Sequence, residues 1–198
     1  VSIWGKGSAG QLVRLVSTWG TNDSTYSDQN GNWKTNILTT NEPGPHSLTI
    51  TIEKEKITIN DVLLGEVWLA AGQSNMEMDF DYCCNTTDHA SHEIATANYP
   101  TVRMFNIKKN LSLVLEDQLK GAWVKAIGED MSPFSAVGYF FTKELAQELD
   151  TPIGIMHASW GGSRLEAWTS HDVLKNLDDY ENELRGLKKI NEENQDAV

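Results

Sequence analysis

A serine lies just past an apolar run, in a position that suits a nucleophile. Residues 67–71 read Val-Trp-Leu-Ala-Ala, and residues 72–74 read Gly-Gln-Ser. A continuous apolar run predicts a strand buried on both faces of a sheet, and ligands of open α/β sheets bind beyond the carboxyl ends of the strands. Ser74 is therefore placed to attack a substrate, with its own backbone N–H near the developing oxyanion. The alternative is that Ser74 only caps a helix, which serine often does.

A second candidate loop follows another predicted buried strand. Residues 153–158 read Ile-Gly-Ile-Met-His-Ala, and residues 159–163 read Ser-Trp-Gly-Gly-Ser. Two consecutive glycines allow a tight turn and a close approach of the backbone. The N–H of Gly161 or Gly162 is therefore a candidate second oxyanion donor, and an ordinary strand-to-helix turn is the alternative.

Taken together, these motifs resemble those of the sialate O-acetylesterases, a family of serine esterases of the SGNH-hydrolase type. Gly-Gln-Ser-Asn-Met around Ser74, preceded by Gly-Glu-Val-Trp, is similar to the family's first block. Ser-Trp-Gly-Gly-Ser followed by Glu-Ala-Trp is similar to its second block. The matching segments, in the family's order, are residues 61–68, 72–76, 134–141, 152–155, 159–163 and 166–168.

The resemblance implies hydrolysis of acetyl esters on sugars, most typically O-acetylated sialic acids, with no metal or other cofactor. Ser74 would be the nucleophile. The backbone N–H groups of Ser74 and Gly162, and after them Gly161, would form the oxyanion hole. Gln73 and Asn75 would support the nucleophile loop.

The residues around the second block would then face the substrate. Trp160 and Trp168 would line the sugar pocket, although packing in the core is an equal alternative for both. Arg164 would meet the sialate carboxylate, and a surface ion pair is its alternative. Glu166 is interpreted as a carboxylate that braces the turn.

Two parts of the family's pattern do not occur in the sequence. One is a Trp-x-Gln-Gly-Glu-Ser segment that supplies a further oxyanion donor, and the other is a catalytic Asp/Glu–His pair. We expect both in a further C-terminal portion of the same protein, which would be a partner of this chain. An acetylxylan-type esterase and a non-catalytic sugar-binding relative are the alternative functions. The histidines present are interpreted as a member of the N-terminal β module (His46), two residues on a solvated helix face rather than a metal site (His89, His92), a core residue (His157) and a surface residue (His171).

These loops require a sheet to position them. Strands alternating with helices predict an α/β fold with a parallel sheet, here an SGNH-like sheet flanked by helices, incomplete in this chain and occupying residues 61–198. The strongest helix prediction has Ser132 as its cap and Pro133 at its first position. The other elements expected are strands at 67–71, 102–107 and 153–158, and helices at 88–98 and 170–187. The apolar stripe of the strongest helix consists of Val137, Phe140, Phe141, Leu145 and Leu149.

Residues 1–60 predict a small β-sandwich-like module. Leu48, Ile50 and Ile52 alternate with threonines, which is the period of a half-buried strand. A polar tip at residues 53–56 separates them from a second alternating segment, so a hairpin is expected. Asn-Gly at residues 30–31 marks another turn.

Composition limits the possible partners and location. The net charge of −12 and the isoelectric point near 4.7 argue against nucleic acid. No apolar run is long enough for a membrane span. Residues 178–198 carry seven acids and three bases, a net charge of −4, and are interpreted as a solvated helix face.

The cysteines and the chain ends give little information about the cellular location of the protein. Cys83 and Cys84 are adjacent, which disfavours a disulfide between them, so two free thiols are expected. The chain starts at Val1 and shows no signal peptide, and both ends are interpreted as cut. A secreted, periplasmic or lysosomal location is expected in preference to a cytoplasmic one.

Overall fold

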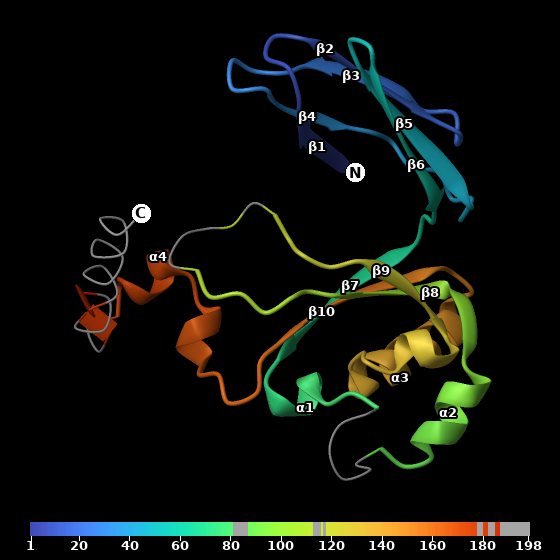
Figure 1. Cartoon of the computed structure of the whole chain (residues 1–198), viewed down its shortest axis with the longest axis vertical. Coiled ribbons are helices and arrows are strands. Elements are labelled where there is room, and N and C mark those ends of the chain that lie inside the picture. Colours follow the sequence, from blue (N-terminus) through green and yellow to red (C-terminus); the bar gives the residue numbers. More distant parts are fainter. Residues whose placement is uncertain (81–86, 113–115, 117, 178–179, 182–184, 187–198) are drawn as a thin grey trace. The chain divides into compact units, whose positions relative to one another are not determined.

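The structure is a computed structural model that describes residues 1–80, 87–112, 116, 118–177, 180–181 and 185–186 (Figure 1). The two cysteines, and most of the helix and acidic run predicted beyond Leu177, lie outside the described residues. The chain forms two compact units. The first comprises Val1–Val67 with Glu144–Gly154, and the second comprises the described parts of Trp68–Lys143 and of the chain from Ile155 onward. The domain boundary expected at residue 60 stays a prediction.

The N-terminal strands form two antiparallel sheets. One is the pair β1–β4, and the other has the order β3-β2-β5-β6. Buried side chains from both sheets, Val13 and Leu15 of β2, Trp33 of β4 and Leu48 of β5, form one core together with Ile37. This shared core confirms the sandwich-like module. The strands are β1 (Ser2–Lys6), β2 (Leu12–Ser17), β3 (Asn22–Tyr26), β4 (Asn32–Asn36), β5 (His46–Ile52) and β6 (Glu55–Val62).

The predicted hairpin is present, with a shorter tip than expected. Ile52 pairs with Glu55, so only Glu53 and Lys54 form the turn, and Glu55 and Lys56 belong to β6. Glu53 takes a left-handed φ of 51° to close this two-residue turn. The second expected turn is also present, with Gly31 at φ 81°.

A four-stranded sheet of order β7-β10-β8-β9 carries the candidate loops (Figure 1). Its strands are β7 (Glu66–Gly72), β8 (Asn98–Asn106), β9 (Trp123–Ile127) and β10 (Ile153–Ser159). β7 and β10 run parallel, because Glu66 N–H donates to the Pro152 carbonyl at one end and Trp160 N–H donates to the Gly72 carbonyl at the other. β9 is antiparallel to β8 and was not predicted, so the sheet is mixed rather than purely parallel.

The prediction that β7 is buried on both faces is wrong. β7 is an edge strand of the sheet that the described residues form. The side chains of Val67, Trp68 and Leu69 are 67%, 41% and 66% exposed, and Ala70 is buried. An apolar run specifies a strand but not the number of neighbours that cover it.

The longest helix, α3 (Ala136–Leu149), begins later than predicted. Ser135, not Ser132, caps it, because Ser135 Oγ accepts the N–H of Gly138 at 3.1 Å. Residues 128–131 form the 3₁₀ segment η1 (Gly128–Met131) just before Ser132 and Pro133.

The predicted apolar stripe of α3 faces outward in this chain. The buried side of the helix is formed by Gly138, Tyr139 and Thr142. The aromatic ring of Phe141 packs edge-on against Trp68 of β7, with ring centroids 5.2 Å apart. The exposed members of the stripe are Val137, Phe140, Phe141 and Leu149.

The remaining helical segments are short. They are α1 (Ser74–Glu77), α2 (Ala90–Thr96), α4 (His171–Leu174) and the 3₁₀ segment η2 (Leu165–Trp168). α4 has Ser170 at its N-cap, where the last helix was predicted to begin. None of the helices in the described part of the chain is long and apolar enough to cross a membrane.

Candidate active site

Ser74 stands at the first position of a tight helical turn. Gln73 is the N-cap residue, and its carbonyl oxygen accepts the N–H groups of Met76 and Glu77 at 3.0 and 2.9 Å. Ser74 therefore does not cap α1, which removes the alternative interpretation of this serine. Its side chain is exposed, at the carboxyl end of β7.

The second candidate loop is a glycine turn that begins where β10 ends. The carbonyl oxygen of Trp160 accepts the N–H of Ser163 at 3.2 Å and its hydroxyl at 2.6 Å. Gly162 has φ +76°, a left-handed conformation that glycine adopts without strain. The turn is thus closed by polar contacts that involve neither glycine.

The two loops meet at Ser74 and Gly161. A Cβ atom placed on Gly161 would lie 3.4 Å from Ser74 Oγ and 3.6 Å from Ser74 Cα. A Cβ on Gly162 would meet nothing within 4 Å. The N–H of Gly162 has no acceptor among the residues that the structure describes. Among the described residues, the turn therefore leaves one donor without an acceptor, on the residue that follows the glycine nearest to Ser74.

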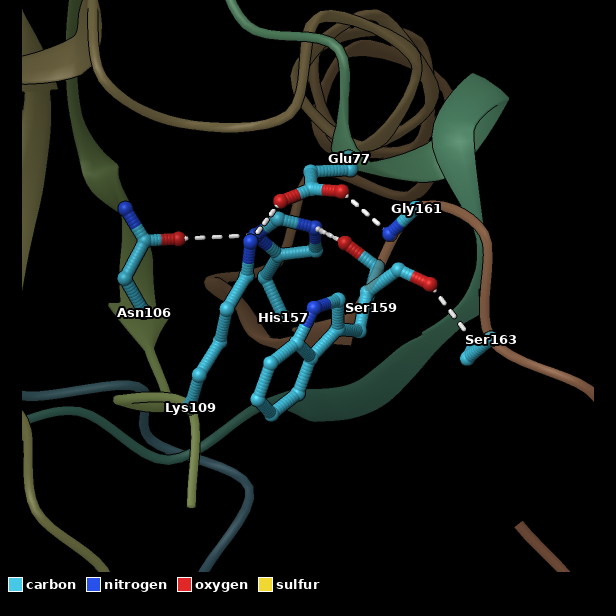
Figure 2. Close-up of polar contacts among 8 residues, drawn as sticks. Glu77, Asn106, Lys109, His157, Ser159, Gly161 and Ser163 are labelled. Atoms are coloured by element: carbon cyan, nitrogen blue, oxygen red, sulfur yellow. Dashed lines mark hydrogen bonds and ion pairs between the residues drawn. The ribbon is translucent and has the colours of Figure 1, made fainter. Parts of the chain in front are cut away.

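The carboxylate of Glu77 joins the two loops, and sequence analysis missed this residue (Figure 2). Gly161 donates its N–H to Glu77 Oε2, and Lys109 donates to Glu77 Oε1. The hydrogen bond from Lys109 is the main reason that the pKa of Glu77 lies below its ordinary value, with burial opposing it. The Gly161 N–H is therefore occupied, and Gly162 is the freer of the two predicted donors.

A polar chain runs from β8 to the end of β10 (Figure 2). Asn106 donates its amide N–H to the Pro133 carbonyl at 2.9 Å, so its oxygen faces His157 Nδ1, also at 2.9 Å. This arrangement places the ring hydrogen on Nδ1. His157 Nε2 then accepts the hydroxyl of Ser159 at 2.5 Å.

The expectation that His157 has its polar atoms satisfied is confirmed, but the residue is half-buried rather than in the core. Its ring packs against Phe134, with centroids 5.3 Å apart. Burial lowers its pKa, and this effect outweighs the backbone of Met76 and the carboxylates of Glu77 and Asp79, which raise it. Both ring nitrogens of His157 are thus hydrogen-bonded.

The predicted loop-support residues are exposed. Neither Gln73 nor Asn75 makes a side-chain hydrogen bond to any residue in the described parts of the chain. Gln73 holds the turn through its backbone carbonyl. The supporting role of the two side chains stays a prediction.

The predicted substrate-facing residues surround the glycine turn. Lys109 Nζ lies 5.4 Å from the ring centroid of Trp160, and the indole N–H of Trp168 donates to Ser163 Oγ at 2.7 Å. Arg164 is exposed. Glu166 accepts the Tyr180 hydroxyl at 2.9 Å, which ties it to a neighbouring segment. The substrate roles remain predictions.

The described residues provide a candidate nucleophile and candidate oxyanion donors, and none of them supplies a base within hydrogen-bond reach of Ser74 Oγ. Ser74 Oγ makes no hydrogen bond to any described residue. His89 and His92 are exposed, with His89 at the N-cap of α2. Within the described ranges, no group of three or more His, Cys, Asp or Glu side chains is arranged to hold a metal ion.

Comparison with known proteins relates the chain to carbohydrate esterases. The model of the carbohydrate esterase family of sialic acid-specific acetylesterases matches residues 64–198. Sialate O-acetylesterases from Homo sapiens and Rattus norvegicus are 33% and 30% identical to it, over 87% of this chain and 36% and 34% of their own lengths. The crystal structure of a carbohydrate acetylesterase from Xanthomonas citri matches with a TM-score of 0.83 at 32% identity, over 88% of this chain and 39% of that one. The chain spans about a third of the length of the curated relatives it matches.

Proposed function

The chain belongs to the carbohydrate esterase family of sialic acid-specific acetylesterases, and from that premise we propose that its protein hydrolyses acetyl esters on sugars with Ser74 as the nucleophile. O-acetylated sialic acids are the proposed substrates. The printed names of the relatives, sialate O-acetylesterase and carbohydrate acetylesterase, support this substrate class.

One observation carries the assignment of the site: Ser74 and Gly161 lie side by side. They come from positions 87 residues apart, and a Cβ on Gly161 would touch Ser74 Oγ at 3.4 Å. Each follows the carboxyl end of a strand, and β7 and β10 are parallel neighbours. A nucleophile beside a glycine turn with an open N–H is the arrangement that acyl transfer requires.

In the proposed reaction, Ser74 Oγ attacks the acetyl carbonyl carbon while a base takes the hydroxyl proton. The carbonyl oxygen becomes an oxyanion that accepts hydrogen bonds from the N–H groups of Ser74 and Gly162. The bond to the sugar oxygen then breaks, and the sugar hydroxyl leaves with the proton. Water hydrolyses the acetyl-serine by the reverse sequence, which releases acetate.

The base is proposed to come from a further portion of the protein. Both ring nitrogens of His157 are engaged by Asn106 and Ser159. Ser74 Oγ has no partner within the described part of the chain. An Asp/Glu–His pair outside this chain, with a Gln-Gly-Glu segment that adds a donor, would complete the site.

The test is the Ser74→Ala substitution in the protein expressed from its full reading frame. We expect no turnover of O-acetylated sialic acid, with the melting temperature and the affinity for the deacetylated sugar close to those of the wild type. Activity within a few-fold of the wild type would refute the assignment of the nucleophile. Parallel assays on acetylated xylan separate the sialate activity from an acetylxylan-type one, and an inactive wild type would favour a sugar-binding relative.

A further inference from the structure

Glu77 lies on the same side of the nucleophile turn as Ser74. The two residues are three positions apart in α1, so their side chains project from neighbouring points of the helical surface. The Glu77 carboxylate reaches the glycine turn after β10, where Oε2 accepts the N–H of Gly161 (Figure 2). This side chain thus links the nucleophile segment to the segment that offers the second oxyanion donor.

Lys109 completes the link from a third segment, just after β8. Its ammonium donates to the other carboxylate oxygen of Glu77 and lies 5.4 Å from the ring centroid of Trp160. The Glu77 side chain is 23% exposed and that of Lys109 is 46% exposed. A lone carboxylate here would repel an oxyanion forming on a substrate bound to Ser74. The neighbouring ammonium offsets that repulsion.

The glycine turn needs such a restraint. Gly161 and Gly162 are consecutive residues without Cβ atoms, so the peptide between them can rotate at little steric cost. The contacts from Ser163 close the turn at Trp160 but leave both glycine N–H groups undirected. Holding the Gly161 N–H on Glu77 restricts the orientation of the next N–H, that of Gly162.

We propose that Glu77 is a positioning residue, which fixes the Gly161 N–H and thereby aims the Gly162 N–H at the oxyanion, while Lys109 neutralises its charge. This inference rests on the proposed function. Glu77 touches neither the substrate nor the reacting atoms and acts through the glycine turn. Its contribution should therefore appear in kcat rather than in KM.

The test compares three substitutions of Glu77 in the protein expressed from its full reading frame. Glu77→Ala removes the acceptor, so kcat should fall by about 10- to 100-fold, with KM changed by less than about threefold. Glu77→Asp keeps the charge but withdraws the acceptor by one methylene, and kcat should fall about tenfold or more. Glu77→Gln keeps an acceptor at the original reach and should retain kcat to within about fivefold.

The relative kcat values of Glu77→Asp and Glu77→Gln separate a positioning role from an effect of the carboxylate charge. If the carboxylate acts by its charge, Asp is active and Gln is not, which would overturn the inference. Should Glu77→Ala fail to fold, the Asp and Gln variants still decide it. Glu144→Ala, which changes an exposed glutamate of α3, is the matched control and should keep the wild-type kcat.

Binding of a boronic acid provides a second readout that a merely structural role would not move. Boron forms a tetrahedral adduct with the serine hydroxyl, and one of its oxygens occupies the oxyanion position. Its affinity should fall in Glu77→Ala by the same factor as kcat, while the affinity for the deacetylated sugar stays constant. If kcat and boronate affinity are unchanged in both Glu77→Ala and Glu77→Asp, this inference is overturned while the proposed function stands. An inactive wild type would instead overturn the proposed function.

Discussion

The backbone N–H of Trp160 donates a 3.0 Å hydrogen bond to the carbonyl oxygen of Gly72. Gly72 ends β7 and Trp160 follows the end of β10, so this bond fixes how far each loop extends beyond the sheet. The closeness of Ser74 and Gly161 is therefore set by the pairing of two strands. Substitutions in the loops should accordingly affect catalysis without unpairing the sheet.

Gly161→Ala should disturb the site by crowding. Its Cβ would lie 2.7 Å from Glu77 Oε2 and 3.4 Å from Ser74 Oγ, and the first distance is too short to be tolerated without movement. We expect kcat to fall by about tenfold or more, because displacing the reacting groups by a fraction of an ångström lowers the rate strongly. Steady-state kinetics on an acetyl ester measure this. An unchanged kcat would mean that the Glu77 side chain moves aside without disturbing the site.

Gly162→Val should disturb the site by a different route, because a Cβ there meets nothing within 4 Å. The φ of +76° is unfavourable for a β-branched residue, so the backbone should rotate and turn the N–H away. Loss of one oxyanion donor costs about 3 kcal/mol of transition-state stabilisation, a hundredfold or more in rate. Gly10→Val is the matched control, since Gly10 has φ +68° and open space but lies in the N-terminal module. Equal rates for both variants would contradict the prediction.

His157 should make the stability of the fold depend on pH. Its pKa is lowered in the folded chain, mainly by burial, from the ordinary value of 6.5. Just below pH 6.5 the unfolded chain therefore binds more protons than the folded chain, so stability falls as the pH falls through this interval. The midpoint of urea unfolding should drop more between pH 7.5 and 5.5 in the wild type than in His157→Gln. The other four histidines are the same in both proteins, so equal drops would refute the assignment.

Ser135→Ala should destabilise the fold by about 1 kcal/mol, because it removes the cap of α3. Ser135 is fully buried, and its hydroxyl also lies 3.5 Å from the sulfur of Met76, beside the nucleophile turn. Urea unfolding measures the change in free energy. Ser91→Ala on the exposed surface of α2 is the control and should change it by less than about 0.5 kcal/mol. A similar effect of the two substitutions would show that Ser135 does not cap the helix.

The strands that carry the candidate loops could be predicted because residues 67–71 are an uninterrupted apolar run and residues 153–158 are broken only by His157. The exposure of β7 could not be predicted, because the hydrophobic pattern of a strand does not show how many neighbouring strands pair with it. The start of α3 was misplaced by three residues because Ser132 and Ser135 can both cap, and Pro133 favoured the earlier one. In the structure Ser135 accepts the Gly138 N–H and also contacts Met76, and the second contact is one that the local sequence does not reveal.

The site itself was predicted only where a motif marked it. Ser74, Gly161 and Gly162 were singled out by type and position, and the fold brings the two segments together. Glu77 was missed, because a glutamate in a first turn is common and only the approach of Gly161 and Lys109 gives it a role. Its spacing of three residues from Ser74 was the one available signal.

The chain also presents an apolar surface that its own described residues leave exposed. Trp68 of β7, and Phe140 and Phe141 of α3, are each at least 40% exposed. Trp68 and Phe141 are in ring contact, so the strand and the helix share this surface. A purified segment comprising residues 1–198 should therefore self-associate. Trp68→Gln with Phe141→Gln should reduce that association in analytical ultracentrifugation, and a monodisperse wild-type segment would contradict the prediction.

The same segment should hydrolyse no esters by itself. A serine hydroxyl is a weak nucleophile until a base takes its proton, and Ser74 Oγ contacts no base among the described residues. His157 is held by Asn106 and Ser159, and its lowered pKa makes it a weak proton acceptor. The measurement is an assay of residues 1–198 with p-nitrophenyl acetate and with O-acetylated sialic acid, alongside the Ser74→Ala variant. Turnover that disappears in Ser74→Ala would show that this segment carries its own base, and the proposal that a further portion of the protein supplies it would be wrong.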